Sequence, residues 1–229
     1  MTTQEFSIEF DILYNNLASN AAPPLNEYEK SVFLTKAQSD IVLELYSGRN
    51  NLGLAFESSE EVRRYLHPLV KQNNITLIPG SDGLYDIQGT SISDVFVIIR
   101  EYLRHSYGET PIVPVTQDEY SKIKQNPFRG PKCYKRALRL EQESKISIAA
   151  ELPIESAGTQ YVITYLKNPD PIILEALPTD DVGKLTIQNE SSESNGELPE
   201  SLHRMILDRA VLYAKQAYVG GQAQRVQQE

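Results

Sequence analysis

Apolar residues recur at helical spacing in three stretches of the first seventy residues. Each stretch opens with a capping residue and a glutamate three positions later: Thr2 and Glu5, Asn26 and Glu29, Ser58 and Glu61. The pattern predicts a first helix to Leu17, a second that ends at Ser47 and Gly48, and a third with apolar residues as far as Val70. The first seventy residues are therefore expected to be mainly helical.

From Ile75 onward the pattern changes to short runs that are typical of strands. Ile75–Ile78 and Leu84–Ile87 flank a turn-rich segment, which predicts a hairpin. Val95–Leu103 is almost continuously apolar and β-branched, which fits a buried strand better than a short helix. Thr116 predicts the start of a short helix that ends before Pro127. Further strands are predicted at residues 137–141, 146–152, 161–166 and 172–174.

The last part of the chain predicts a loop followed by a helix. Residues 188–198 are polar and acidic, which predicts an exposed loop. Pro199 suits the first turn of an amphipathic helix that Gly220 and Gly221 are expected to end, and residues 222–229 are expected to form a flexible tail.

These elements predict the domain organisation and the fold class. The expected parts are an N-terminal helical region, a β-rich insert with the acidic loop, a C-terminal helix that packs on the N-terminal helices, and the tail: residues 1–73, 74–198, 199–221 and 222–229. The predicted fold class is α+β, a helical bundle formed by the N- and C-terminal helices with an inserted antiparallel β layer.

Composition restricts the function classes. The 229 residues have the composition of an ordinary globular protein and suffice for one or two domains. No stretch approaches the roughly 18 apolar residues that span a bilayer, and the first residues lack a signal-peptide pattern, so a cytosolic origin and no membrane contact are expected. Cys133 is the single cysteine and the three histidines are scattered, which argues against a structural zinc site. No metal or other cofactor is expected.

Charge is distributed unevenly along the chain. The net charge of −9 argues against general nucleic-acid binding, because phosphate contacts come largely from clustered Lys and Arg. Between Asp118 and Arg139, however, there are seven basic and two acidic residues, whereas the rest of the chain has 15 basic and 29 acidic residues. Opposite poles of this kind suit head-to-tail contact between copies or contact with an acidic partner. An ordinary solvated face is the alternative interpretation.

A search for catalytic motifs finds no phosphate-binding loop, dinucleotide fingerprint, nucleophile elbow or metalloprotease motif. Asp180 and Asp181 lack further oxygen ligands at calcium-loop spacing and are interpreted as solvated loop acids. Asp170 lacks the Glu-x-Lys partner that a metal-dependent nuclease would use. The three histidines fall in separate predicted elements and receive no role. We therefore predict that the protein is not an enzyme and has no catalytic residues.

Several blocks of sequence are more specific than their secondary structure requires. They are Glu9–Asn16, Leu25–Gln38, Asp118–Tyr120 with Asn126–Pro131, Tyr161–Leu174 and His203–Val211. In this order and combination they resemble virion structural proteins, the head-to-tail connector or ring proteins of crAss-like Bacteroidetes tailed phages. The blocks span nearly the whole chain, and none is a catalytic motif.

The resemblance implies a structural subunit of the phage neck, a ring or adaptor protein that connects the capsid portal to the tail. The implied partners are copies of the chain itself in a ring, the portal protein and other neck or tail ring proteins, with passive contact to genomic DNA in the channel left open. The implied location is the neck or tail region of the virion, after assembly in the cytoplasm of the bacterial host.

A ring requires an interface in which one surface of a subunit meets a different surface of the next. The candidate interface residues, for a neighbouring subunit or the DNA channel, are Arg129, Lys132, Lys135, Arg136 and Arg139. Two other function classes stay open at this point. One is a virion-carried or host-acting enzyme whose site is built from scattered residues, and the other is a soluble adaptor outside any particle.

Overall fold

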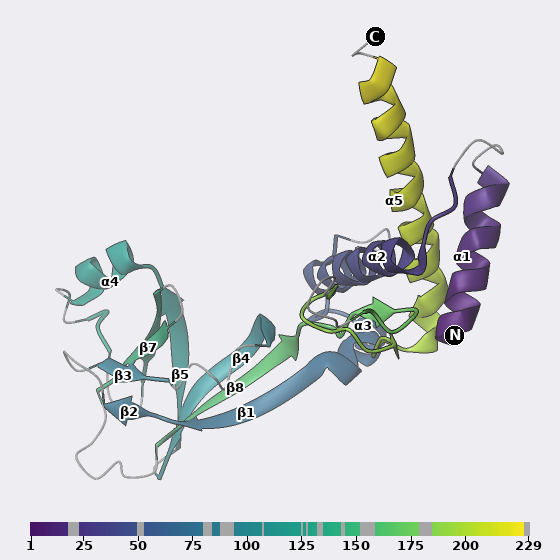
Figure 1. Ribbon diagram of the computed structural model, residues 1–229. Coiled ribbons are helices and arrows are strands. Elements are labelled where there is room, and N and C mark those ends of the chain that lie inside the picture. The colour runs from purple at the N-terminus through teal and green to yellow at the C-terminus, as the bar shows by residue number, and fades with distance from the viewer. Residues whose placement is uncertain are drawn as a thin grey trace. The chain divides into compact units, whose positions relative to one another are not determined.

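The computed structural model describes residues 1–17, 23–49, 53–79, 84–87, 94–106, 108–124, 126, 128–131, 135–142, 145–151, 159–178 and 185–226. The chain forms two compact units (Figure 1). The helical unit comprises residues 1–69 and 168–229, and the sheet unit comprises residues 70–167. Both ends of the chain therefore contribute to the helical unit.

Helix α1 spans Thr3–Leu17. At its start, the Thr2 N–H donates to the Glu5 carboxylate and the Glu5 N–H donates to the Thr2 hydroxyl. This capping box satisfies N–H groups that have no partner inside the helix. The apolar side chains on one face are buried: Phe6, Phe10 and Tyr14. The predicted capped, amphipathic helix is confirmed.

Helix α2 spans Glu27–Ser47. Asn26 and Glu29 form its capping box, with hydrogen bonds of 2.8 and 2.9 Å. Gly48 ends the helix with a φ of 74°, a left-handed conformation that glycine adopts without the strain of a side chain. The predicted start and end of this helix are both confirmed.

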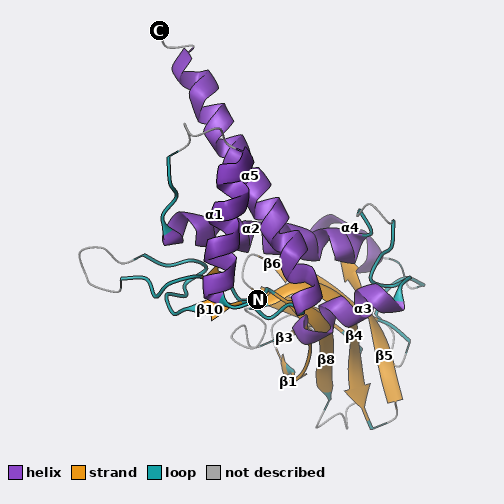
Figure 2. Ribbon diagram, turned by 90° about the vertical axis from the view of Figure 1, so that its right-hand side faces the viewer, coloured by secondary structure: helices purple, strands orange, loops and turns teal. Residues whose placement is uncertain are grey.

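Helix α5 spans Glu200–Val226 and packs along α1 and α2 (Figure 2). Its buried residues include Leu202, Ile206, Leu207, Ala210 and Ala214. The start after Pro199 is confirmed, but the predicted end is wrong, because the helix continues through Gly220 and Gly221. A glycine lowers helix stability by only about 1 kcal/mol relative to alanine, so two glycines need not end a long helix.

Helix α3 spans Glu60–Leu66 and is followed by a 3₁₀ turn, η1, at His67–Leu69. Its N-cap is Ser59, one residue later than predicted. Pro68 cannot donate the hydrogen bond that would continue the helix. Val70, which its spacing assigned to this helix, begins a strand instead.

The helical unit also contains a small two-stranded sheet. Strands β9, Ile172–Ile173, and β10, Ser194–Asn195, are antiparallel. Segment 188–198, for which an exposed acidic loop is predicted, therefore includes a short strand. Its last residue, Leu198, is buried.

The sheet unit is built on one eight-stranded sheet, in the order β1-β8-β4-β5-β6-β7-β3-β2. Its strands are β1 Val70–Thr76, β2 Ile78–Pro79, β3 Leu84–Asp86, β4 Val95–His105, β5 Gly108–Val115, β6 Ala137–Gln142, β7 Lys145–Ala149 and β8 Gln160–Lys167. Neighbouring strands are antiparallel except β5 and β6, which are parallel. A parallel pair needs a crossover connection, and helix α4, Gln117–Lys124, lies in it.

Local sequence patterns located several of these elements correctly. The long strand β4 confirms the strand predicted from Val95. Thr116 caps α4 as expected, and Glu119 completes the capping box. The predicted hairpin is confirmed for β2 and β3, where Ile78 lies opposite Asp86. The residues before it, up to Thr76, pair with β8 instead.

The sheet unit has its own hydrophobic core. Its buried members are Ile75, Leu77, Ile87, Leu103, Ile112, Ala137, Ile148, Tyr161, Ile163 and Tyr165. All of them belong to the sheet strands or to residues directly beside them. The sheet unit is therefore a packed layer with an interior of its own.

The predicted fold class is wrong. The fold is mixed α/β and is dominated by a curled sheet, not a helical bundle with an inserted antiparallel layer. The parallel β5–β6 pair also makes the sheet mixed. Each strand leaves a local pattern, but the pairings of β8 with β1 and β4, which lie far from it in the sequence, bring these segments into one sheet and leave no local pattern.

Candidate interaction surfaces

The basic residues predicted to form an interface lie in different environments. Arg129 and Lys135 are exposed, and Arg136 is half-buried with its guanidinium donating to the Arg129 carbonyl at 3.3 Å. Lys132 lies outside the described residues. We call Arg129, Lys135 and Arg136 the basic loop, because these three described members of the set are exposed or half-exposed to solvent.

Arg139 belongs to a buried charge cluster in the sheet unit. Its side chain is 11% exposed, and its Nε lies 3.4 Å from Oε1 of Glu101, which is 7% exposed. Glu141 lies 3.1 Å from the Arg139 Nη1, and the Tyr161 hydroxyl donates to Glu101 at 2.9 Å. Burial raises the pKa of Glu101, although the positive charge of Arg139 opposes this shift. The cluster joins β4, β6 and β8.

Phe128 is the most exposed large apolar side chain in the described part of the chain, at 80%. A tight turn fixes its backbone. The Phe128 N–H donates to the side chain of Asn126 at 2.9 Å, and the N–H groups of Arg129 and Gly130 both donate to the Asn126 carbonyl at 3.1 Å. Asparagine side chains commonly stabilise turns in this way. An aromatic side chain therefore projects from an ordered turn next to a cation.

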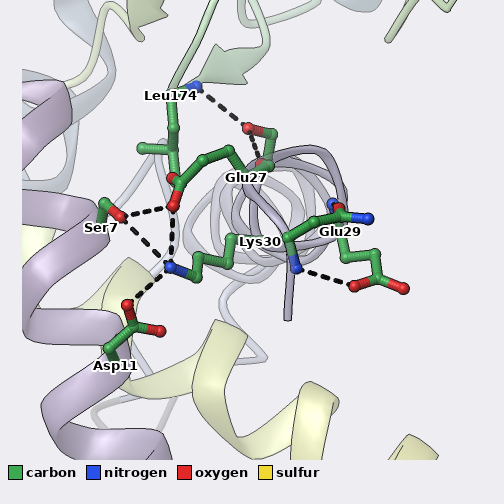
Figure 3. A network of polar contacts seen from close by, with 8 residues as sticks. Ser7, Asp11, Glu27, Glu29, Lys30 and Leu174 are labelled. Carbon is green, nitrogen blue, oxygen red and sulfur yellow. Dashed lines mark hydrogen bonds and ion pairs between the residues drawn. The ribbon is translucent and has the colours of Figure 1, made fainter. Parts of the chain in front are cut away.

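A buried lysine joins the first two helices of the helical unit (Figure 3). The Lys30 side chain is 3% exposed, and its ammonium donates to Asp11 at 2.7 Å, to Glu27 at 2.9 Å and to the Ser7 hydroxyl at 3.2 Å. Three acceptors match the three donors of an ammonium group. Burial lowers the pKa of Lys30, but Asp11 and Glu27 outweigh this effect and the pKa is raised. The lysine therefore stays charged.

Polar side chains on one face of α2 bind the backbone of residues 170–174. Ser31 accepts from the Leu174 N–H at 3.0 Å, Thr35 accepts from the N–H and donates to the carbonyl of Ile172 at 3.1 and 3.3 Å, and Gln38 donates to the Asp170 carbonyl at 2.8 Å. These contacts join two of the blocks that carry the resemblance, residues 25–38 and 161–174. Sequence reasoning missed them, although polar residues one helical turn apart on a buried face were a usable signal.

Thr35→Val should lower the free energy of unfolding by about 1–2 kcal/mol, because it keeps the side-chain shape and removes both hydrogen bonds to the buried Ile172 backbone. Urea denaturation measures the change. Ser39→Ala is the matched control, since Ser39 is only half-buried and its hydroxyl bonds to the Thr35 carbonyl within the same helix. Equal losses in the two variants would contradict a special role for the contact to Ile172.

An apolar pocket of about 360 Å³ lies among α2, α3 and α5 of the helical unit. Its buried lining side chains are Ile41, Leu45, Val62 and Leu202. Its solvent-exposed lining residues are Glu61, Ser201 and Met205. Arg209 also lines the pocket and donates to both carboxylate oxygens of Glu44, at 2.7 and 3.0 Å. We call this site the apolar pocket.

The histidines do not converge on a common site. His67 is exposed, the ring of His105 lies 3.0 Å from the Thr110 hydroxyl, and the ring of His203 lies 2.9 Å from the Leu198 carbonyl. Within the described ranges, no group of three or more His, Cys, Asp or Glu side chains could hold a metal ion. None of the described helices is both long and apolar enough to cross a membrane.

The two units differ in charge. The helical unit has 20 acidic and 10 basic residues, and the sheet unit has 11 acidic and 12 basic residues. The negative charge of the chain therefore resides in the helical unit, which contains the apolar pocket, whereas the basic loop belongs to the nearly neutral sheet unit.

Comparison with known proteins identifies the family. Ring protein 3 of Bacteroides phage crAss001 is 39% identical over 230 residues, which cover 93% of this chain and 95% of that protein. Ring protein 4/5 of the same phage is 36% identical over 231 residues, which cover 96% and 94% of the two chains. The protein is therefore a phage structural component of the ring-protein class.

The sequence profile of the phage tail ring protein 3/4 family matches residues 1–225. The chain belongs to this family, and the resemblance to ring proteins of crAss-like phages that its sequence blocks indicated is confirmed.

Proposed function

We propose that this chain is a structural subunit of the phage neck, that its copies close into a ring, and that the ring connects the capsid portal to the tail. The observation that carries the proposal is the match of nearly the whole chain to two proteins named as ring proteins. The proposed partners are further copies of the chain, the portal protein and neighbouring neck or tail rings, with passive contact to genomic DNA where the channel passes. The proposed function requires surfaces and no catalytic centre.

The charge distribution supports head-to-tail assembly. A ring of identical subunits needs two different surfaces that complement each other, so that each subunit both presents and receives a contact. The acidic helical unit and the basic loop are such a pair on one chain. Contacts between opposite charges steer association and fix its orientation.

Light scattering of the purified protein, alone and with its cognate portal, tests the proposal. We expect a closed oligomer or a portal-bound complex whose mass falls at high salt, because salt screens contacts between exposed charges. The mass at physiological and at high salt gives the comparison. A protein that stays monomeric and does not bind the portal at any protein or salt concentration would contradict the proposal. This result would favour an adaptor outside the particle.

A further inference from the structure

We infer that Phe128 of one copy inserts into the apolar pocket of the next copy, with the basic loop against the acidic residues beside that pocket. The inference rests on the proposed ring function and names the contact that would build the ring. It uses two surfaces of the same chain, one from the sheet unit and one from the helical unit.

The first half of the contact is an exposed aromatic side chain on an ordered turn. Phe128 is 80% exposed, whereas an aromatic side chain stabilises an interface by burying roughly 150–250 Å². The three hydrogen bonds to Asn126 hold the turn before any partner arrives. A contact that is ordered in advance loses less conformational freedom on binding.

The second half is a pocket of matching chemistry. Its volume of about 360 Å³ lies at the small end of the range of roughly 300–1,000 Å³ for ligand pockets, which suits one aromatic side chain better than a large ligand. Aliphatic side chains from α2, α3 and α5 line it. Glu44 and Arg209, two of the charged groups of its wall, form an ion pair with each other, so an apolar side chain can enter without leaving these two charges unpaired.

Charge gives the contact its direction. Arg129 follows Phe128 directly and is exposed. In the receiving copy, Glu61 of helix α3 lines the pocket and Glu57 lies just before α3 in the sequence. Both glutamates are exposed. A cation next to the inserting side chain and carboxylates next to the receiving pocket are complementary.

A second copy is the occupant that these observations favour. The inserting side chain and the receiving pocket lie on different surfaces of one chain, which is the requirement for a heterologous interface that can close into a ring. An aromatic residue of another protein in the same pocket is the competing occupant, and the test below separates the two.

Two single variants and their mixture test the contact. Phe128→Ala removes the inserting side chain but leaves the pocket open. Ser201→Trp fills the pocket from an exposed position and leaves Phe128 intact. Ile8→Ala is the control, because Ile8 is 61% exposed and lies on α1, which does not line the pocket. Circular dichroism verifies that each variant is folded, and light scattering gives its mass.

The inference predicts that each test variant assembles at least roughly 30-fold more weakly than the wild type, the effect expected for loss of an aromatic hot spot. The control should assemble as the wild type does. Mixing the two variants should give a 1:1 heterodimer that grows no further, because Phe128 of the Ser201→Trp chain meets the open pocket of the Phe128→Ala chain.

The negative results separate an error in the proposed ring from an error in the proposed contact. A wild-type protein that never assembles, alone or with portal, contradicts the proposed ring, and the contact falls with it. A wild type and a Phe128→Ala variant that both form the ring overturn the contact and leave the ring intact. Two variants that fail to assemble and also fail to form a heterodimer overturn it as well, because the pocket must then receive something other than Phe128 of a second copy.

Discussion

Arg139→Met should lower the free energy of unfolding of the sheet unit by about 3 kcal/mol, because it removes one partner of a buried ion pair and leaves the other charged. Methionine retains much of the apolar volume of the buried arginine stem, so the change removes mainly the charge. Glu101, at 7% exposure, then keeps the hydrogen bond from the Tyr161 hydroxyl but has lost its buried cation. Urea denaturation followed by circular dichroism measures the loss.

A matched control and a double variant sharpen this prediction. Arg104 is 47% exposed, lies 4.0 Å from Glu109 and donates to the Tyr102 hydroxyl at 2.8 Å, so Arg104→Met should lower the free energy of unfolding by only about 1 kcal/mol. In the double variant Glu101→Gln/Arg139→Met no buried charge remains unpaired, and most of the lost stability should return. A double variant as unstable as Arg139→Met alone would show that lost packing, not the unpaired carboxylate, causes the effect.

The same cluster predicts a pH dependence. The pKa of Glu101 is raised in the folded protein, so the stability linked to this group is present below the usual pKa of a glutamate and is lost as the pH rises through the raised value. Without Arg139 the pKa should rise further. The deficit of Arg139→Met should therefore widen between about pH 4 and pH 7. A deficit that is constant over this range would contradict the assignment to Glu101.

Lys30→Met should lower the free energy of unfolding of the helical unit by about 2 kcal/mol, because Asp11 and Glu27 lose their shared cation between α1 and α2. The loss is smaller than at Arg139, since Asp11 is 47% and Glu27 34% exposed and water can hydrate both. Thermal and urea denaturation of the variant measure it. Lys36→Met, at an exposed position of the same helix, removes only a cation–π contact to the Tyr213 ring at 4.9 Å and should lower the free energy of unfolding by less than about 1 kcal/mol. Similar losses at the two lysines would contradict the role of the buried network.

The helices of the helical unit could be predicted because their signals are local. The capping boxes at Thr2 and Asn26, and the glycine at position 48, each act within a few residues and each form as expected. The end of α5 could not be predicted from Gly220 and Gly221, because their effect on a helix is small compared with what packing along a long helix contributes.

The sheet could be predicted only in pieces. The strands β4 and β8 have apolar, β-branched sequences that indicate a strand by themselves. Strand β1 pairs with β8, which lies far away in the sequence. The residues Val70–Thr76 alone therefore do not determine which strand they pair with. Without the strand pairing, the predicted elements are also compatible with a helical bundle that carries a β insert. The molecule instead has a curled sheet with its own core.

The candidate interface residues lie in different environments, which their charge alone does not distinguish. Arg129 and Arg139 contribute equally to a basic segment of the sequence, but Arg129 is exposed and Arg139 lies between two buried leucines of β6. Residues on both faces of that strand are buried, so the usual alternation of inside and outside fails there. The sequence does not mark Phe128 as a contact residue, because one apolar residue between polar ones is common, and only its 80% exposure on an ordered turn sets it apart.

Electron microscopy of the purified protein over a range of concentrations tests the central claim, that copies of this chain close into a ring, most directly. The heterologous contact proposed here predicts end-on views with a central opening and one discrete diameter. The same contact without closure would give open filaments. Filaments, or isolated monomers at every concentration with and without portal, would contradict the closed ring.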